Sequence, residues 1–375
     1  MISDVLEREH GEIRRAASLR LSNFRNYDSL DLELQSGFHV IAGENAQGKT
    51  NLLEALEFIA STRLLRGIRD AEAIQEGAPR LRVECDLADV GTTLGLTVER
   101  GVRKRAYLNG LGLPRASDLI GRLLAVCISS ADLPLVIGEP SDRRLFLDLE
   151  LSQLYPGYLR AFTLYKRALE QRNALLKMAQ EQFMDSAAFE PWEHQMAESG
   201  SAMRNYRRRY VDDLALYASQ VQEELGQGEE LSTRYLQKDE AFDAPSMERL
   251  FAEGRRGETA RGSTLVGPHR DDLTLLVDGR EARLYGSQGQ QRSTVVSLKL
   301  ATFELIRRKL GQSPLLLLDD MLSDLDEGRR ARLCAWIVER AGQALLTCTE
   351  PAAAGPQILE RSTILKVVAG KIEVQ

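Results

Sequence analysis

The sequence is poor in the side chains from which metal sites and disulfide frameworks are built. It contains 4 cysteines and 4 histidines among 375 residues. None of the cysteines forms the C-x-x-C pair that zinc and redox motifs use. We therefore expect Cys85, Cys127, Cys334 and Cys348 to be reduced, buried thiols in a protein of the cytoplasm.

Long apolar runs and an excess of positive charge are missing as well. No segment reaches the ~18 apolar residues that a membrane span requires. Residues 1–17 mix charges of both signs without the apolar centre of a secretory signal, and we expect them to form a poorly ordered extension. The formal net charge of −6 argues against coating nucleic acid through bulk charge, although it permits a local basic groove.

The rest of the chain has two textures. Alternating or short apolar segments predict strands mixed with helices in residues 18–145 and 263–375, where Asn109-Gly110 predicts a hairpin turn. Residues 146–262 contain mainly helix formers and predict a helical insert. A helix of about 40 residues is only about 60 Å long. The insert is therefore expected to be a short arm rather than a long coiled coil.

A glycine-rich segment carries the clearest chemistry. The pattern G-x-x-x-x-G-K-[ST] is matched, between an apolar strand and an amphipathic helix, by Gly43, Glu44, Asn45, Ala46, Gln47, Gly48, Lys49 and Thr50. Backbone N–H groups of such a loop surround phosphate oxygens. We expect Lys49 to reach the β- and γ-phosphates of ATP and Thr50 to ligate Mg²⁺. Ala46 replaces a frequent glycine, which is tolerable if its backbone angles stay in the common region.

A second motif is the apolar run that ends in two carboxylates, Leu315 to Asp320. Four consecutive leucines are typical of a strand buried on both faces of a parallel sheet. The carboxyl end of such a strand lies where ligands bind. We expect Asp319 to hold Mg²⁺ and Asp320 to orient or deprotonate the attacking water.

Residues 285–293, YGSQGQQRS, lack any catalytic side chain. A serine hydroxyl and glycine N–H groups at a helix N-terminus can bind a phosphate without adding negative charge, whereas a plain helix cap is the simpler interpretation. The segment resembles the signature motif of ABC-type ATPases. Ser323 and Asp326 follow where that group carries its D-loop. The implied fold is α/β: an ABC-type P-loop ATPase head of mixed sheets and helices, with the helical arm inserted.

The motif order is similar to the SMC-like branch of DNA-repair ATPases, and within it to the RecF family. The stretches NFRNY, YKRALEQRN and LVGPHRDD carry that resemblance. It implies an ATP-dependent head-to-tail homodimer in which Ser287, Gly289 and Gln290 act in trans on ATP of the partner chain. It also implies clamping of double-stranded DNA near gaps, weak DNA-stimulated ATP hydrolysis as a release switch, and cooperation with RecO and RecR in recombinase loading, gap repair, replication restart and the SOS response.

Other SMC-like or ABC ATPases, nuclease-associated or transporter-coupled, remain as alternatives. No clear Gln-loop glutamine occurs in AVCISSADL, and no switch histidine occurs in ALLTCTE, where Thr347 or a neighbour can take its place. His269 in GPHRDD is either structural or functional.

Clusters of basic residues are the candidates for contact with DNA. They follow the phosphate-loop helix or lie in the insert: Arg63, Arg66, Arg160, Lys166, Arg167, Arg207 and Arg208, with Arg172 and Arg204 nearby. Solvated helix faces explain such clusters equally well. A groove that follows the DNA backbone predicts instead that binding weakens steeply with salt and ignores base sequence.

Overall fold

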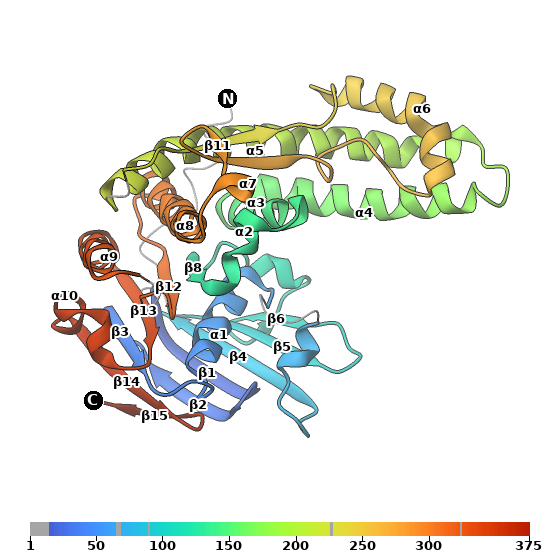
Figure 1. Cartoon of the computed structure of the whole chain (residues 1–375). Helices are drawn as coiled ribbons and strands as arrows, with labels where there is room; N and C mark the ends of the chain where they lie inside the picture. The colour runs from blue at the N-terminus through green and yellow to red at the C-terminus, as the bar shows by residue number, and fades with distance from the viewer. Residues whose placement is uncertain (1–14, 65–68, 89–90, 226–227, 323–324) are drawn as a thin grey trace. The chain divides into compact units, whose positions relative to one another are not determined.

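The computed structural model describes residues 15–64, 69–88, 91–225, 228–322 and 325–375 (Figure 1). The chain packs as two compact units. Unit 1 contains the described residues within 15–133, 220–228 and 295–375, and unit 2 contains those within 134–219 and 229–294. Most of the expected N-terminal extension, residues 1–14, lies outside the described residues, and the first strand begins at Ala16.

Unit 1 contains an antiparallel sheet in the order β2-β1-β4-β5-β6-β7 (Figure 1). Its strands are β1 (Ala16–Phe24), β2 (Tyr27–Glu33), β4 (Arg80–Leu87), β5 (Thr92–Glu99), β6 (Arg105–Leu108) and β7 (Leu111–Gly112). Alternate residues, such as Leu19, Val83 and Leu96, are buried together with apolar residues of helix α1 (Lys49–Ser61). The predicted hairpin turn is confirmed, because Asn109 and Gly110 join β6 to β7 with φ of 51° and 77°.

A second sheet of unit 1 carries the nucleotide motifs. Its order is β15-β14-β3-β13-β12-β8, and all its pairs are parallel except β14–β15. The strands are β3 (Gly37–Ala42), β8 (Ala125–Ser129), β12 (Leu315–Asp319), β13 (Gln343–Cys348), β14 (Ser362–Val368) and β15 (Lys371–Val374). Leu315 to Leu318 are all buried, as the leucine run predicts. Helices α9 (Glu327–Arg340) and α10 (Pro356–Leu359) also belong to unit 1, together with α8 (Gln288–Leu310) from residue 295 onward, while the first turns of α8 belong to unit 2.

Unit 2 is mainly helical. Its helices are α2 (Pro134–Ile137), α3 (Pro140–Leu154), α4 (Pro156–Met178), α5 (Glu190–Glu224), α6 (Ala244–Arg261) and α7 (Ala282–Tyr285), with the last turn of α5 assigned to unit 1. Helices α4 and α5 run antiparallel (Figure 1), because Arg172 contacts Glu193 while Tyr158 contacts Arg207. The 35 residues of α5 span about 52 Å, which agrees with a short arm.

One element of unit 2 was not expected. Strand β9 (Leu231–Leu236) lies in the predicted helical block and pairs along its whole length with β10 (Asp272–Val277), which also pairs with β11 (Arg280–Glu281). This pairing draws residues 263–294 into unit 2, although their texture suggested the same block as residues 295–375. Long-range strand pairing, which a local sequence pattern does not reveal, therefore places the boundary between the two units after residue 294 rather than after residue 262.

Short 3₁₀ turns lie at Asp70–Ala73, Ala116–Leu119, Ser130–Asp132, Ser186–Ala188 and Pro351–Ala354. None of the described helices combines the length and the apolar character that crossing a bilayer requires.

Candidate nucleotide-binding site

The phosphate loop connects β3 to α1 and has a backbone that requires glycine at two points. Gly43 has a φ of 155°, and Gly48, which precedes α1, has a φ of 112°. A β-carbon on Gly43 would lie 2.4 Å from the carbonyl oxygen of Val367, and one on Gly48 would lie 2.5 Å from the Asn26 side chain. Helix α1 has no side-chain cap, so its first N–H groups are available to an anion.

Ala46 corrects the sequence analysis. Its φ is 65°, in the left-handed region, and not in the common region that would make alanine easy to tolerate. A β-carbon in the left-handed conformation costs roughly 1–2 kcal/mol. The loop thus holds a strained residue at a ligand site, where such strain is often found.

We predict that Ala46→Gly raises the free energy of unfolding by about 1 kcal/mol, because glycine adopts the left-handed conformation without a steric penalty. The midpoint of urea unfolding without nucleotide measures this change. Ala174→Gly, at an exposed position inside α4, is the matched control and is expected to lower the free energy of unfolding by about 1 kcal/mol. An Ala46→Gly midpoint at or below that of the parent would contradict the strained conformation.

The phosphate loop is held from outside by contacts that the sequence analysis did not assign to the site. The Asn26 side-chain amide and the backbone N–H of Gly370 both donate to the carbonyl oxygen of Gln47, at 2.9 and 3.2 Å. The Tyr27 hydroxyl donates to the carbonyl oxygen of Gly48 at 3.1 Å. The loop conformation therefore depends on the β1–β2 turn and the β14–β15 turn. The stretch NFRNY, which includes Asn26 and Tyr27, was the only sequence signal for these contacts.

Lys49 and Thr50 begin α1 and face different partners. The Lys49 ammonium donates to the carbonyl oxygens of Gly43 and Glu44 at 2.6 and 2.8 Å, within its own loop. The Thr50 hydroxyl donates to Asp319 Oδ1 at 2.8 Å. The structure thus brings the loop and the end of β12 into contact, although 269 positions separate Thr50 from Asp319.

Thr347 links the two carboxylates that follow the leucine run. It lies beside Asp319 in the β12–β13 register and donates from its hydroxyl to Asp319 Oδ1 at 2.8 Å. The same hydroxyl oxygen accepts the backbone N–H of Asp320 at 2.9 Å. Asp320 is exposed and has a φ of 53°, so this hydrogen bond supports an uncommon conformation. Thr347 therefore fixes both acids from the position where a switch histidine was sought.

The oxygens of Thr50 and Asp319 fit a Mg²⁺ site. Magnesium is usually bound by one or two protein oxygens, and it completes its octahedron with water and substrate phosphates. Within the described part of the chain, no group of three or more histidine, cysteine or acidic side chains offers a separate metal cluster. The hydroxyl–carboxylate pair is therefore the donor set that this chain presents beside the phosphate loop.

The signature segment forms a reciprocal helix cap at the start of α8. The Gln290 N–H donates to the Ser287 hydroxyl at 3.2 Å, and the Ser287 N–H donates to the Gln290 side-chain oxygen at 2.7 Å. Gln290 also donates to Glu229 at 2.9 Å. Ser287 and Gly289 are exposed. The simpler interpretation, a helix cap, is therefore present in the structure, and it leaves the exposed face of the cap open to a ligand.

The expected D-loop is described only in part, because Ser323 lies outside the described residues. Asp326 precedes α9 and accepts the backbone N–H of Arg329 at 2.9 Å, so it caps that helix. Asp326 is exposed, and the Arg329 side chain forms an ion pair with it at 3.2 Å. These contacts give Asp326 a structural role in this chain.

Arg207 was a candidate for DNA contact, and the structure contradicts that assignment. Its side chain is 1% exposed and donates to Asp148 at 2.6 Å and to the carbonyl oxygen of Pro268 at 2.7 Å. Arg172 and Arg204 are 0% exposed and also form ion pairs. Buried guanidinium groups need such partners because desolvation of an unpaired charge is costly. These arginines stabilise unit 2 and are not available to DNA.

The other basic candidates have different surroundings. Exposed side chains belong to Arg63, Arg160, Lys166 and Arg167. Arg208 is half-buried and donates to Asn205 and Gln237 at 3.3 and 3.4 Å, while Arg66 lies outside the described residues. Contact of these residues with DNA stays a prediction.

His269 has partners for both ring nitrogens. Nδ1 lies 2.6 Å from the Tyr165 hydroxyl, and Nε2 lies 3.1 Å from the carbonyl oxygen of Thr264. Burial lowers the pKa of His269 to about 4, so the ring is neutral at physiological pH. The contacts favour the structural role over the functional one.

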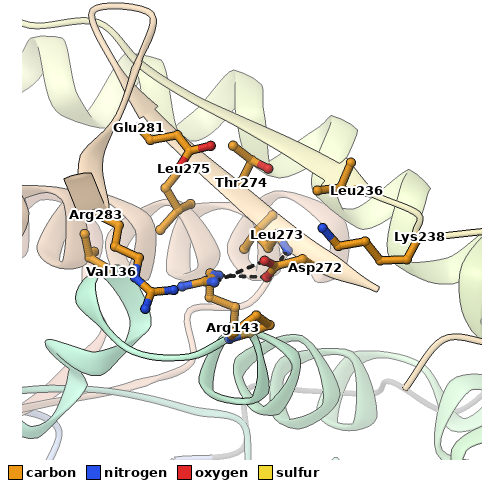
Figure 2. A pocket seen from close by; sticks show the side chains of 11 residues that line it. Val136, Arg143, Leu236, Lys238, Asp272, Leu273, Thr274, Leu275, Glu281 and Arg283 are labelled. Atoms are coloured by element: carbon orange, nitrogen blue, oxygen red, sulfur yellow. Dashed lines mark hydrogen bonds and ion pairs between the residues drawn. The ribbon is translucent and has the colours of Figure 1, made fainter. Parts of the chain in front are cut away.

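A pocket of about 240 Å³ lies in unit 2 beside β10 (Figure 2). Its arginines already have carboxylate partners: Arg143 binds both oxygens of Asp272 at 2.8 and 3.1 Å, and Arg283 pairs with Glu139 at 2.9 Å. Figure 2 shows the Arg143–Asp272 pair within the pocket. Because these guanidinium groups are neutralised, the pocket has little net attraction for an anion.

Comparisons with known proteins agree with this geometry. The family model for the RecF/RecN/SMC N terminal domain matches residues 16–355. A protein of Symbiobacterium thermophilum named DNA replication and repair protein RecF is 41% identical over 345 residues, covering 89% of this chain and 91% of that protein. The protein of the same name from Halalkalibacterium halodurans is 37% identical, with 95% and 98% of the two chains covered.

Solved structures show the same fold. The recombination mediator protein RecF with ATP, described as part of the RecFOR pathway, has a TM-score of 0.88 at 27% identity and covers 98% of this chain and 100% of its own. The Smc head domain of Pyrococcus furiosus has a TM-score of 0.55 at 16% identity, covers 97% of this chain and 96% of its own, and shows the fold alone. The phosphate loop, the acidic end of β12 and these similarities together show that the chain belongs to the RecF family of DNA replication and repair proteins, within the SMC-like ATP-binding ATPases.

Proposed function

We propose that this protein is an ATP-gated clamp for double-stranded DNA that acts near single-strand gaps. The observation that carries the proposal is that Thr50 and Thr347 both donate to Asp319 beside the phosphate loop, in a chain of the RecF family. A relative of the same fold has been solved with ATP in a pathway named RecFOR. We extend the proposal to cooperation with RecO and RecR in recombinase loading, gap repair, replication restart and the SOS response in the cytoplasm. Family membership favours it over a nuclease-associated or transporter-coupled ATPase.

Different residues of unit 1 bind the phosphates of ATP, hold the metal ion and orient the attacking water. Loop N–H groups and Lys49 bind and orient the phosphates, for which Lys49 exchanges its contacts with the Gly43 and Glu44 carbonyls. Thr50 and Asp319 would hold Mg²⁺, which supplies charge neutralisation at the phosphates. Asp320 orients the attacking water, and Thr347 keeps its backbone in place. The shorter reach of aspartate compared with glutamate fits slow hydrolysis, which suits a release switch.

The signature segment supplies the other half of each site from the partner chain. The exposed Ser287 and Gly289 at the start of α8 offer a hydroxyl and backbone N–H groups without negative charge. In a homodimer in which the N-terminus of α8 contacts the ATP bound by the partner chain, dimerisation would depend on ATP binding. DNA held by the dimer would then be released after hydrolysis.

A gel shift with a gapped duplex tests the function. With ATP and Mg²⁺, the parent protein is expected to form a dimer and retain the duplex, and without ATP it is expected to lose at least tenfold in affinity. Equal affinity with and without ATP would overturn the gating. Light scattering in the same buffers reports the dimer independently of DNA.

We predict that Ser287→Arg leaves ATP binding within about threefold of the parent and abolishes ATP-dependent dimerisation. The introduced arginine side chain fills the position of the phosphate at the N-terminus of α8. Loss of the serine cap lowers the free energy of unfolding by only about 1 kcal/mol. Fluorescent-ATP titration and light scattering measure the two properties. Asp243→Ala is the control, because it removes a side-chain cap of similar energy from α6, away from the nucleotide motifs. Loss of ATP binding by monomeric Ser287→Arg would overturn the action in trans.

A further inference from the structure

The solvent face of the antiparallel sheet carries a band of arginines that the sequence analysis did not assign. Residues alternate between the two faces of a strand, so the face opposite the core contains Arg82 of β4, Thr97 of β5 and Arg105 of β6 in one cross-strand row. Arg80 lies two positions before Arg82 on the same face. All three arginines are exposed.

These arginines surround a pocket of about 240 Å³ in unit 1. Arg103, from the β5–β6 turn, is the fourth arginine of the lining, and Glu99 is the single carboxylate in it. Among the described residues, no ion pair or hydrogen bond involves the side chains of Arg80, Arg103 and Arg105. The band therefore keeps a net positive charge.

Arg82 and Tyr107 give the pocket one preorganised wall. The guanidinium of Arg82 lies 5.6 Å from the centre of the Tyr107 ring and donates to Glu84 at 2.8 Å. A guanidinium fixed in this way loses less conformational freedom when it binds a phosphate. Ser22 and Thr97 line the same pocket with small hydroxyl side chains, which leave space between the arginines.

The spacing of these arginines is compatible with an extended polyanion. Arg80 and Arg82 are two residues apart on one strand, which is about 7 Å, and Arg82 and Arg105 are two strand spacings apart, which is about 10 Å. Arginine side chains whose backbone positions are this far apart can contact neighbouring phosphates along a nucleic-acid strand.

The buried arginines of the arm and the arginines in the pocket of Figure 2 do not offer such a site. Arg204 and Arg207 of the arm are buried and paired, and Arg143 in the pocket of Figure 2 is neutralised by Asp272. Unpaired exposed arginines contribute little to the stability of the fold. In a chain with a formal net charge of −6, a local cluster of this kind points to an anionic ligand.

We propose that the sheet face formed by Arg80, Arg82, Arg103 and Arg105, here called the arginine band, binds the sugar–phosphate backbone of double-stranded DNA. This inference rests on the proposed function and names the surface of unit 1 that the DNA contacts. Guanidinium groups on a sheet face that contact phosphates carry no base readout, so binding by the band is expected to be independent of sequence.

The test compares Arg80→Gln/Arg105→Gln with the parent in a fluorescence anisotropy titration of labelled duplex DNA, in ATP and Mg²⁺ over a series of salt concentrations. Each lost phosphate contact reduces the slope of log affinity against log salt by about 0.9, so the double variant is expected to have a slope about 1.8 smaller. At 0.1 M salt this corresponds to a loss of affinity of about 60-fold. Both substitutions are at exposed positions, so the unfolding midpoint and ATP affinity are expected to stay unchanged.

Arg256→Gln/Arg361→Gln is the matched control. It removes the same charge from exposed positions, one in each unit, outside the arginine band. The control is expected to keep the slope of the parent. If Arg80→Gln/Arg105→Gln keeps the parental slope and affinity, or if the control loses as much affinity as this variant, the arginine band is not a DNA site.

If the parent itself fails to bind duplex DNA with ATP, the proposed function is overturned and the inference with it. If the parent binds duplex DNA and Arg80→Gln/Arg105→Gln binds it equally well, only the inference about the arginine band is overturned.

Discussion

Lys49→Met is expected to lower the affinity for ATP about 100-fold and to abolish ATP-dependent DNA binding. Hydrogen bonds to a charged group contribute about 1.5–3 kcal/mol each. The Lys49 ammonium has two acceptors in its own loop and is expected to exchange them for phosphate oxygens. A loss of about 3 kcal/mol corresponds to roughly a 100-fold weaker complex. Isothermal titration calorimetry measures the ATP affinity, and the gapped-duplex gel shift measures the consequence.

The control for this experiment is Lys177→Met, which removes an exposed lysine from the last turn of α4. It makes the same chemical change away from the phosphate loop and is expected to bind ATP as the parent does. If Lys49→Met bound ATP within about threefold of the parent, the phosphate loop would not be the nucleotide site. If it lost ATP but clamped DNA normally, the gating of DNA binding by ATP would be wrong.

Asp271→Ala is expected to destabilise unit 2 by about 3–5 kcal/mol, because it leaves a buried guanidinium without one of its carboxylates. Asp271 is 0% exposed and accepts two hydrogen bonds from Arg204, at 2.8 and 2.9 Å, and one from the Tyr235 hydroxyl at 2.5 Å. Its Oδ1 also accepts the backbone N–H of Lys238 at 3.1 Å. Alanine supplies none of these acceptors, and Asp239 alone would have to compensate Arg204.

The two tryptophans allow each unit to be followed separately. Trp192 lies in unit 2 and Trp336 in unit 1, so single-tryptophan variants report the urea unfolding of one unit each. Asp271→Ala is expected to lower the midpoint reported by Trp192 more than that reported by Trp336. Asp212→Ala, at an exposed position of α5, is the matched control and should change the free energy of unfolding of neither unit by more than about 0.5 kcal/mol. A small effect of Asp271→Ala on the Trp192 midpoint would show that the buried network contributes little.

Part of the site was readable in the sequence because its geometry is local. The phosphate loop needs only a strand, Gly43, Gly48 and a following helix, and all of these lie within one short segment. The leucine run before Asp319 likewise predicts a buried strand from its composition alone. One local feature of the loop was not predicted: the positive φ of Ala46 arises from the tight curl of the loop, and an alanine in the sequence does not indicate it.

Contacts between distant segments were not readable in the same way. Thr347 was named only as a substitute for a missing histidine, and its hydrogen bonds to Asp319 and Asp320 exist because β13 pairs with β12. Asn26 belonged to a stretch used only for resemblance. Its contact with Gln47 requires the β1–β2 turn to lie against the phosphate loop.

Sequence by itself thus determined the chemistry of this protein: a phosphate loop, two acids at a strand end, a signature segment and membership of a DNA-repair family. Tertiary structure alone decided which arginines are free. Arg207 and Arg105 look equally basic in the sequence, but Asp148, Tyr158 and Pro268 enclose Arg207, whereas Arg105 remains exposed on a sheet face. The reason is physical: a guanidinium has the same charge everywhere, and only its burial and its partners, contributed by distant segments, determine whether that charge stabilises the fold or attracts a ligand.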